Sequence, residues 1–223
     1  MTLRLTASNI GKGYNGNQVL RDCSFSCDEL GVYVLTGVNG CGKSTFLRIC
    51  ALIEPPDSGE IGYFSNGNMV QKDLELKRRI TLVLPRVGVF NTTVFKNVAY
   101  GLSIRGMDRD DAEKKVNKVL EFVGLSHKKE QNALTLSSGE TQRLGIARAI
   151  VIGPEILFLD EPTASVDQKN TDSIEQIILE MKRNTRTTVV ITTHDHVQAE
   201  RLADFLLVMK EGKVFADKSP RSF

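Results

Sequence analysis

Residues 37–45, Gly-Val-Asn-Gly-Cys-Gly-Lys-Ser-Thr, have the composition and spacing of a phosphate-binding loop. Gly37, Gly42, Lys43 and Ser44 fit the pattern of a glycine, any four residues, a glycine, a lysine and a serine or threonine. Glycine permits the tight turn that points successive backbone N–H groups at phosphate oxygens. Lys43 can add a positive charge at the β- and γ-phosphates, and Ser44 can offer its hydroxyl to Mg²⁺. This phosphate loop therefore predicts a site for a nucleotide and its Mg²⁺.

The residues on either side of the phosphate loop favour the strand and the helix that such a loop requires. Residues 32–35 are an apolar run typical of a buried strand. Four apolar residues then recur at the spacing of an amphipathic helix: Phe46, Ile49, Cys50 and Ile53. We expect Pro55-Pro56 to end this helix, since proline breaks a helical backbone. A helix beginning at the loop also favours a bound anion through its dipole. A chance glycine-rich turn is the weaker interpretation.

Two carboxylates, Asp160 and Glu161, follow the apolar run 156–159. If that run is a buried strand, Asp160 lies at its carboxyl end, where open α/β sheets bind ligands. Asp160 could then hold Mg²⁺ through water, and Glu161 could orient or deprotonate a water that attacks the γ-phosphate. A strand followed by two solvated acids is common, so the pattern becomes specific only together with the phosphate loop.

Residues 136–140, Leu-Ser-Ser-Gly-Glu, have two interpretations. Ser137 and Glu140 have the spacing of a capping box before a helix at 141–152. The same helix start could instead be a second anion site, directed at the γ-phosphate that another subunit holds. The physics of these residues alone leaves both interpretations open.

The remaining patterns predict an α/β fold built on a phosphate-loop NTPase core sheet. The first part of the chain is strand-like, with runs of β-type residues at 3–7, 18–26 and 60–64. Apolar runs typical of buried parallel strands occupy 80–84, 156–159 and 188–191, and a terminal hairpin is expected at 205–216. Helical stripes predict an inserted α-helical subdomain at 85–150, with Asp108 and Gly124 bounding one helix. The whole chain, 1–223, would form a single domain, with 1–84 and 151–223 as its core.

Taken together and in this order, the motifs resemble the nucleotide-binding subunit of ATP-binding cassette (ABC) transporters over about residues 3–217. The phosphate loop matches the Walker A motif, and 156–160 matches Walker B, with Glu161 at the catalytic position. Residues 136–140 resemble the signature LSGGQ, with Ser138 and Glu140 as departures, and are called the signature segment below. Residues 164–167, which include Ser165, resemble the D-loop.

The resemblance implies the ABC ATPase fold, in which the N-terminal strands form an antiparallel β subdomain, and a site for ATP and Mg²⁺ shared by two subunits. Tyr14 would stack on adenine. The phosphates would be held by the loop residues Gly37, Val38, Asn39, Gly40, Cys41, Gly42, Lys43, Ser44 and Thr45. Mg²⁺ would be held by Ser44 and Asp160, while Glu161 and His194 would be catalytic. The partner subunit would cap the γ-phosphate through its signature residues Ser137, Ser138, Gly139 and Glu140, with Asp167 crossing the interface.

One position departs from the family in a way that matters chemically. The family usually has a glutamine after the strand at 80–84, and Pro85 stands there in this chain. Proline offers neither a side-chain oxygen nor a backbone N–H, so it cannot make the contacts of that glutamine with Mg²⁺ and the attacking water. Gln71 lies too early to substitute. The departure thus implies either a weaker link between the nucleotide state and the rotation of the helical subdomain, or a replacement ligand at Mg²⁺.

Composition narrows the class of protein. The chain has 41% hydrophobic residues and a net charge of +2, which gives no support for nucleic-acid binding. It has no apolar run near the ~20 residues that span a bilayer and no N-terminal signal-peptide pattern. We therefore expect a cytoplasmic protein, peripheral on the inner face of the cell membrane. Its four cysteines are expected to be reduced thiols.

The family resemblance implies partners and leaves alternatives. As a subunit without a fused membrane domain, the chain most resembles the ATPase of an importer, working with transmembrane permease subunits, a second copy of itself and an extracytoplasmic solute-binding protein. Apolar residues in 87–95 would dock the permease, and residues 90–101 are similar to oxyanion importers, including tungstate-type systems. The alternative is a soluble ABC ATPase that acts on nucleic acid or ribosomes. A kinase or GTPase outside the family is disfavoured by the signature segment.

Overall fold

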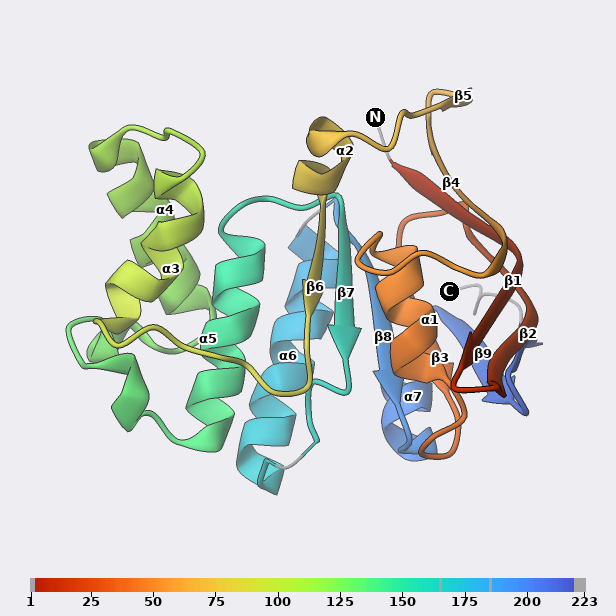
Figure 1. Ribbon diagram of the computed structural model, residues 1–223. Coiled ribbons are helices and arrows are strands. Elements are labelled where there is room, and N and C mark those ends of the chain that lie inside the picture. Colours follow the sequence, from red (N-terminus) through yellow and green to blue (C-terminus); the bar gives the residue numbers. More distant parts are fainter. Residues whose placement is uncertain (1–2, 165, 185, 219–223) are drawn as a thin grey trace.

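The computed structural model describes residues 3–164, 166–184 and 186–218, which form two sheets and a set of helices (Figure 1). The six-stranded sheet consists of β3 (Val32–Thr36), β6 (Ile80–Val83), β7 (Ile156–Asp160), β8 (Thr188–Thr193), β9 (Phe205–Lys210) and β10 (Lys213–Lys218). The four-stranded sheet consists of β1 (Arg4–Tyr14), β2 (Asn17–Cys27), β4 (Ser58–Ser65) and β5 (Asn68–Met69). The helices are α1 (Lys43–Cys50), α2 (Leu74–Arg79), α3 (Val94–Ser103), α4 (Arg109–Phe122), α5 (Ser138–Ile150), α6 (Gln168–Asn184) and α7 (His196–Leu202), with two 3-10 turns, η1 (Ser126–Lys128) and η2 (Ala133–Thr135).

The six-stranded sheet has the order β10-β9-β3-β8-β7-β6 and is parallel from β9 to β6. All residues of β3, β7 and β8 are buried, as in a parallel sheet covered on both faces. Successive side chains enter different cores, so that Val34 packs in one hydrophobic cluster and Leu35 in the other. The predicted parallel core sheet is confirmed, and its last strand, β10, is antiparallel to β9.

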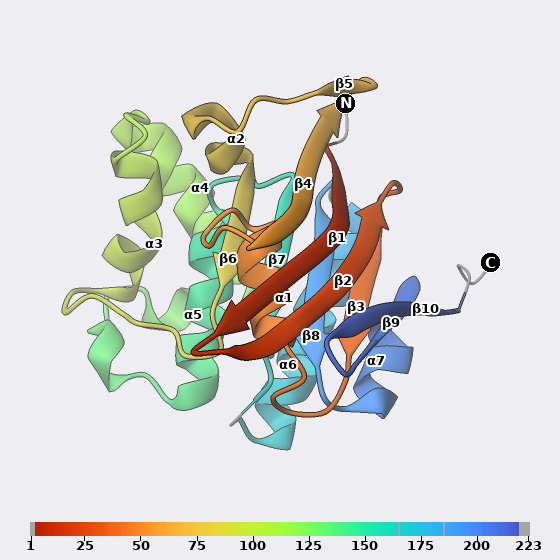
Figure 2. The same ribbon diagram turned by 45° about the vertical axis from the view of Figure 1, so that its right-hand side comes forward.

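One hydrophobic cluster joins the two sheets around α1. In Figure 2, α1 lies behind β1 and β4 and in front of β7. The cluster takes its residues from the four-stranded sheet, from α1 and from one face of β3, β7 and β8. Phe46 of α1, for example, meets Phe25 of β2 edge to face, with ring centroids 6.2 Å apart. The predicted N-terminal antiparallel sheet is confirmed, and it holds the helix that follows the phosphate loop.

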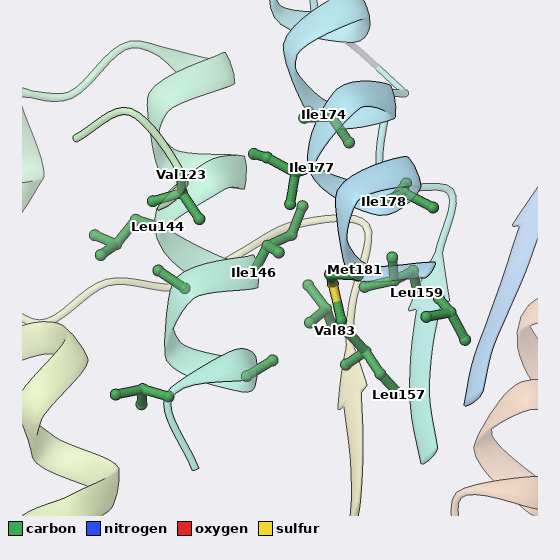
Figure 3. Packing of buried hydrophobic residues seen from close by; sticks show 14 of the residues in the cluster. Val83, Val123, Leu144, Ile146, Leu157, Leu159, Ile174, Ile177, Ile178 and Met181 are labelled. Carbon is green, nitrogen blue, oxygen red and sulfur yellow. The ribbon is translucent and has the colours of Figure 1, made fainter. Parts of the chain in front are cut away.

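The second cluster binds the helices of 94–150 to the opposite face of the parallel sheet. Ile146 of α5 and Ile177 and Met181 of α6 converge there on Val83 and Leu157 of the sheet (Figure 3). The helices α3 and α4 pack against α5 on its far side (Figure 1). Asp108 caps α4 by accepting the N–H groups of Asp110 and Asp111, as the sequence predicted. The expected ABC ATPase fold is thus present.

Several boundaries differ from the sequence-based expectations. Helix α1 ends at Cys50, ahead of Pro55, and Ile53 is 67% exposed because the chain has left the helix at Leu52, which has a φ of 57°. Helix α5 begins at Ser138, directly after its cap, and not at residue 141. The short helices α2 and α7 were not predicted from the sequence. Among the described residues, no helix combines the length and apolarity needed to cross a bilayer.

Candidate nucleotide site

The carboxyl ends of three neighbouring strands bring the predicted site residues together. Strand β3 leads into the phosphate loop, β7 ends at Asp160, and β8 ends one residue before His194. The arrowheads of β7 and β8 point to the same edge of the sheet, where α1 also begins (Figure 1), and β3 runs parallel to β8. Register places Asp160 opposite Thr192 in the neighbouring strand. Parallel topology therefore gathers into one edge residues that lie more than a hundred positions apart in the chain.

The glycines of the phosphate loop are required by its backbone and by its neighbours. Gly40 and Gly42 have φ values of 80° and 111°, a region that side chains strongly disfavour. A Cβ on Gly42 would also lie 2.8 Å from Cδ2 of Leu20, and one on Gly37 would lie 2.4 Å from the carbonyl oxygen of Met209. Val38, Asn39 and Gly40 stay exposed at the tip. The loop therefore exposes backbone that a phosphate can approach closely.

Lys43 lies at the centre of the site, where its ammonium group contacts oxygen atoms of the phosphate loop and of Glu161. Its side chain is only 3% exposed, and its Nζ donates to the carbonyl oxygen of Gly37 at 2.7 Å. The same Nζ is 3.2 Å from Oε1 of Glu161. A cation held under an exposed loop by carbonyl and carboxylate oxygens is well placed to receive phosphate oxygens.

Asp160 is the buried anchor of the site. It is 1% exposed, and its Oδ1 accepts from Oγ of Ser44 at 3.0 Å and from Oγ1 of Thr192 at 2.7 Å. Carboxylate and hydroxyl oxygens are the hard ligands that Mg²⁺ prefers, so Ser44 and Asp160 fit this ion chemically. Thr192 also accepts the backbone N–H of Glu161 at 3.0 Å. The sequence analysis assigned Thr192 no role, although its place at the end of a buried apolar strand was a usable signal.

Glu161 turns its carboxylate into the site through an unusual backbone. Its φ of 45° lies in the left-handed region, which a non-glycine residue seldom adopts without support from its surroundings. Oε1 faces Nζ of Lys43, while Oε2 is 3.1 Å from Nδ1 of His194. The structure thus joins the two residues that the sequence analysis named as catalytic, Glu161 and His194.

The Thr192→Val substitution tests how Asp160 and Glu161 are held. Valine keeps the shape of threonine but removes the hydroxyl, which leaves the Asp160 carboxylate and the Glu161 N–H each without one partner. We expect the free energy of unfolding to fall by about 1–3 kcal/mol in urea denaturation. Thr36→Val is the matched control, because Thr36 Oγ1 is buried without a hydrogen-bond partner in the described part of the chain. Equal losses in both variants would contradict this role.

Tyr14 stands at the end of β1 and is 38% exposed. Its hydroxyl donates to the carboxylate of Glu54, and this bond, with Arg48 also contributing, lowers the pKa of Glu54. Arg48 bonds Glu54 at 3.2 Å and Oγ1 of Thr45 at 3.3 Å, so the network reaches the phosphate loop. The Nζ of Lys12 lies 5.7 Å from the centroid of the Tyr14 ring. The stacking of Tyr14 on adenine stays a prediction.

The signature segment forms the start of α5. Ser137 caps the helix, and Glu140 completes a capping box by accepting the Ser137 N–H at 3.0 Å. A Cβ on Gly139 would lie 2.1 Å from Cγ of Asn170, which in turn donates to Asp167, whose pKa is lowered by the Asn170 backbone N–H. The helix starts of α5 and α6 therefore lie against each other. Ser165 of the expected D-loop lies outside the described residues.

The structure does not bring the signature segment to the phosphate loop of the same chain. Within the described residues, no side-chain hydrogen bond or ion pair links 137–140 with 37–45. Figure 1 nevertheless shows the start of α5 at the same edge of the molecule as the start of α1. The N-terminal ends of α1 and α5, which both favour anions, thus lie at one edge of the molecule, where a second subunit could contact them.

A cleft of about 290 Å³ opens between β6, α3 and α5. Its lining is largely apolar around two arginines: Thr81, Leu82, Val83, Leu84, Arg86, Val87, Gly88, Asn97, Tyr100, Gly101, Gly145, Arg148, Ala149 and Ile152. Leu84, Phe90 and Tyr100 are exposed near it, and Arg148 lies 4.9 Å from the Phe90 ring centroid. Pro85 lies in the segment that joins β6 to this cleft. An apolar surface of this kind suits a protein partner.

Comparison with known sequences identifies related proteins. A family model described as ABC transporter matches residues 20–164. The tungstate uptake system ATP-binding protein TupC of Peptoclostridium acidaminophilum is 35% identical over 212 residues, covering 95% of this chain and 97% of TupC. The phosphate import ATP-binding protein PstB 2 of Natronomonas pharaonis is 36% identical over 222 residues, covering 94% of this chain and 78% of that protein.

Solved structures show the same architecture. CbiO1 of Clostridium perfringens, part of the ABC transporter complex CbiONQ, matches with a TM-score of 0.86 at 28% identity, over 99% of this chain and 90% of CbiO1. The ATP-binding cassette MJ0796, solved as a dimer in a post-hydrolysis state with ADP and Pi, matches with a TM-score of 0.85 at 25% identity, over 98% of this chain and all of that one.

Proposed function

This chain belongs to the ABC transporter family and is an ATP-binding ATPase, and from that premise we propose that it drives a membrane permease for solute import. The observation that carries this proposal is the cluster of Lys43, Asp160, Glu161 and His194 at one sheet edge, with an apolar cleft beside the helices of 94–150. The residue cluster would hydrolyse ATP, and the apolar cleft would offer a surface for the permease. The alternative, a soluble ABC ATPase acting on nucleic acid or ribosomes, is not favoured, because two related proteins are named as ATP-binding subunits of uptake and import systems.

At the site, the chain's own residues would divide the chemistry of hydrolysis. The phosphate loop and Lys43 would hold the phosphates, and Tyr14 would stack on adenine. Mg²⁺, held by Ser44 and Asp160, would neutralise phosphate charge when bound. Glu161 would orient the attacking water and accept its proton, and His194 would hydrogen-bond the γ-phosphate and keep Glu161 in place. Positioning of this kind accounts for most of the catalysis of phosphoryl transfer.

We propose that the active form is a homodimer closed by two ATP molecules. Ser137 and Gly139 of one subunit would cap the γ-phosphate held by the other, since a helix start and its dipole favour a bound anion. Ser138 and Glu140 complete that segment, and Asp167 would meet the partner near the same point. Each chain carries both half-sites, so a homodimer has two equivalent sites.

The helices of 85–150 would act as a subdomain that contacts the permease, with 1–84 and 151–223 as the core. The cleft and the apolar residues of 87–95 would take a cytoplasmic loop of the permease. This contact would hold the subunit at the inner face of the membrane. Pro85 cannot supply the side-chain oxygen of the usual glutamine, so the link from nucleotide to subdomain would be weaker or carried by another ligand. A solute-binding protein would deliver the cargo outside the cell.

We propose a tetrahedral oxyanion as the cargo class. Two related ATP-binding proteins are named for tungstate and phosphate uptake, and both align with nearly all of this chain. The ATPase subunit contacts nucleotide and permease and not cargo, so relatedness, and not its own residues, supports this proposal.

Co-purification tests the proposed function. Glu161→Gln with Mg-ATP would serve as bait in detergent-solubilised native membranes, and Glu161→Gln carrying Lys43→Ala as the matched control. We expect the bait, and not the control, to recover a multi-span permease identified by mass spectrometry. The solute-binding protein of that system is then expected to bind tungstate or phosphate in calorimetry. Recovery of ribosomes or nucleic acid without a permease would favour the alternative.

A further inference from the structure

Glu140 places a carboxylate in the first turn of α5, the helix start that we propose faces the partner subunit's γ-phosphate. A carboxylate there is favourable for the isolated helix because it complements the dipole. It is unfavourable for an incoming phosphate, since two anions then share one small, partly desolvated site. The signature segment can therefore receive ATP well only if the charge of Glu140 is compensated.

Lys128 supplies a compensating charge. Its Nζ lies 2.6 Å from Oε1 of Glu140, and the two side chains are only 24% and 16% exposed. The other carboxylate oxygen, Oε2, accepts the N–H of Ser137. Together, with Lys128 as the main cause, these contacts lower the pKa of Glu140 and hold its carboxylate back against the helix cap. A pair this sheltered is screened by salt less than an ordinary surface pair.

The backbone fixes where Lys128 stands. Its N–H donates to the carbonyl oxygen of Leu125 at 3.0 Å, within the turn η1 that follows α4. The residues just after it are tied to the start of α3, since Phe95 N–H donates to Lys129 O and Val94 N–H to Gln131 O, both at 2.9 Å. Lys128 thus reaches the signature segment from a loop that is itself pinned to helix α3.

We infer that Lys128 is a positioning residue for ATP-driven closure: it neutralises Glu140 and holds it against Ser137, so that the start of α5 can accept the γ-phosphate of the partner's ATP. This inference rests on the proposed function, namely the dimer closed by ATP. Lys128 would not itself contact the nucleotide. It would be needed only while residue 140 carries a negative charge.

The test is a double-mutant cycle in the Glu161→Gln background, where hydrolysis is blocked. Sedimentation velocity gives the Mg-ATP concentration at which half of the protein is dimeric. We expect Lys128→Met to raise that concentration about tenfold, which corresponds to about 1.4 kcal/mol. Lys128→Arg should stay close to the parent, because it restores the charge. In a Glu140→Gln background, where the amide can still bond the cap, Lys128→Met should change the concentration less than about twofold.

Lys129→Met is the matched control, since Lys129 is exposed, follows Lys128 directly, and has no ion-pair partner among the described residues. It should leave the half-saturating concentration unchanged, and thermal melts would check that every variant is folded. The inference is overturned if Lys128→Met has no effect, or if its effect is the same with Glu140 and with glutamine there. A parent that never dimerises with Mg-ATP would instead overturn the proposed function, and the inference with it.

Discussion

Lys43→Ala is expected to abolish ATP hydrolysis and to weaken ATP binding by about 10²–10³-fold, the scale of losing one fixed charge donor in a preorganised site. The buried ammonium group of Lys43 lies between the phosphate loop and Glu161, and in the described structure it is the cation that bonds both. Without it, the loop's N–H groups alone would face the phosphates, and Glu161 would lose its charge partner. A fluorescent ATP analogue measures binding, and release of phosphate measures turnover.

The matched control for that experiment is Lys118→Ala, which removes an exposed lysine on the far helix α4. It should leave both binding and turnover near the parent values, because an isolated surface charge contributes little. Undiminished turnover in Lys43→Ala would rule out the assignment of residues 37–45 as the phosphate loop. A large drop in both variants would point to a general loss of folding, which a thermal melt would reveal.

Glu161→Gln is expected to keep ATP binding, to lower the rate of hydrolysis by about 10²–10⁴-fold, and to trap a closed dimer. Glutamine keeps the shape of the side chain and its bond to His194, but it cannot take a proton from the attacking water. Binding survives because Lys43 and the phosphate loop are unchanged. Single-turnover hydrolysis and sedimentation with saturating Mg-ATP provide the two measurements.

Glu180→Gln, an exposed position on α6, controls for the loss of a carboxylate as such. It should hydrolyse ATP at the parent rate and show no trapped dimer. If Glu161→Gln remained monomeric with Mg-ATP and hydrolysed it at the parent rate, Glu161 would not be the group that accepts the proton. Another carboxylate at this sheet edge, with Asp160 the nearest, would then have to be considered.

Features that depend on neighbours in the chain could be predicted from the sequence by itself. The phosphate loop needs glycines at fixed spacing, and Ser137 and Glu140 form their capping box within one helical turn. Asp108 caps α4 in the same local way. Apolar runs predicted β3, β7 and β8, and the order of the motifs predicted the ABC ATPase fold. These predictions succeeded because short-range hydrogen bonds and hydrophobic periodicity are set locally.

Features that depend on which strands and helices become neighbours were decided only by the tertiary structure. Thr192 meets Asp160 because β8 happens to lie beside β7 in a particular register, and Lys128 meets Glu140 because the loop after α4 returns to α5. The same applies to Tyr14 with Glu54. The end of α1 was also misjudged: Ile53, which the sequence pattern placed on the apolar stripe of this helix, lies beyond its end and is 67% exposed. Long-range packing selects these contacts, and no periodicity along the chain encodes them.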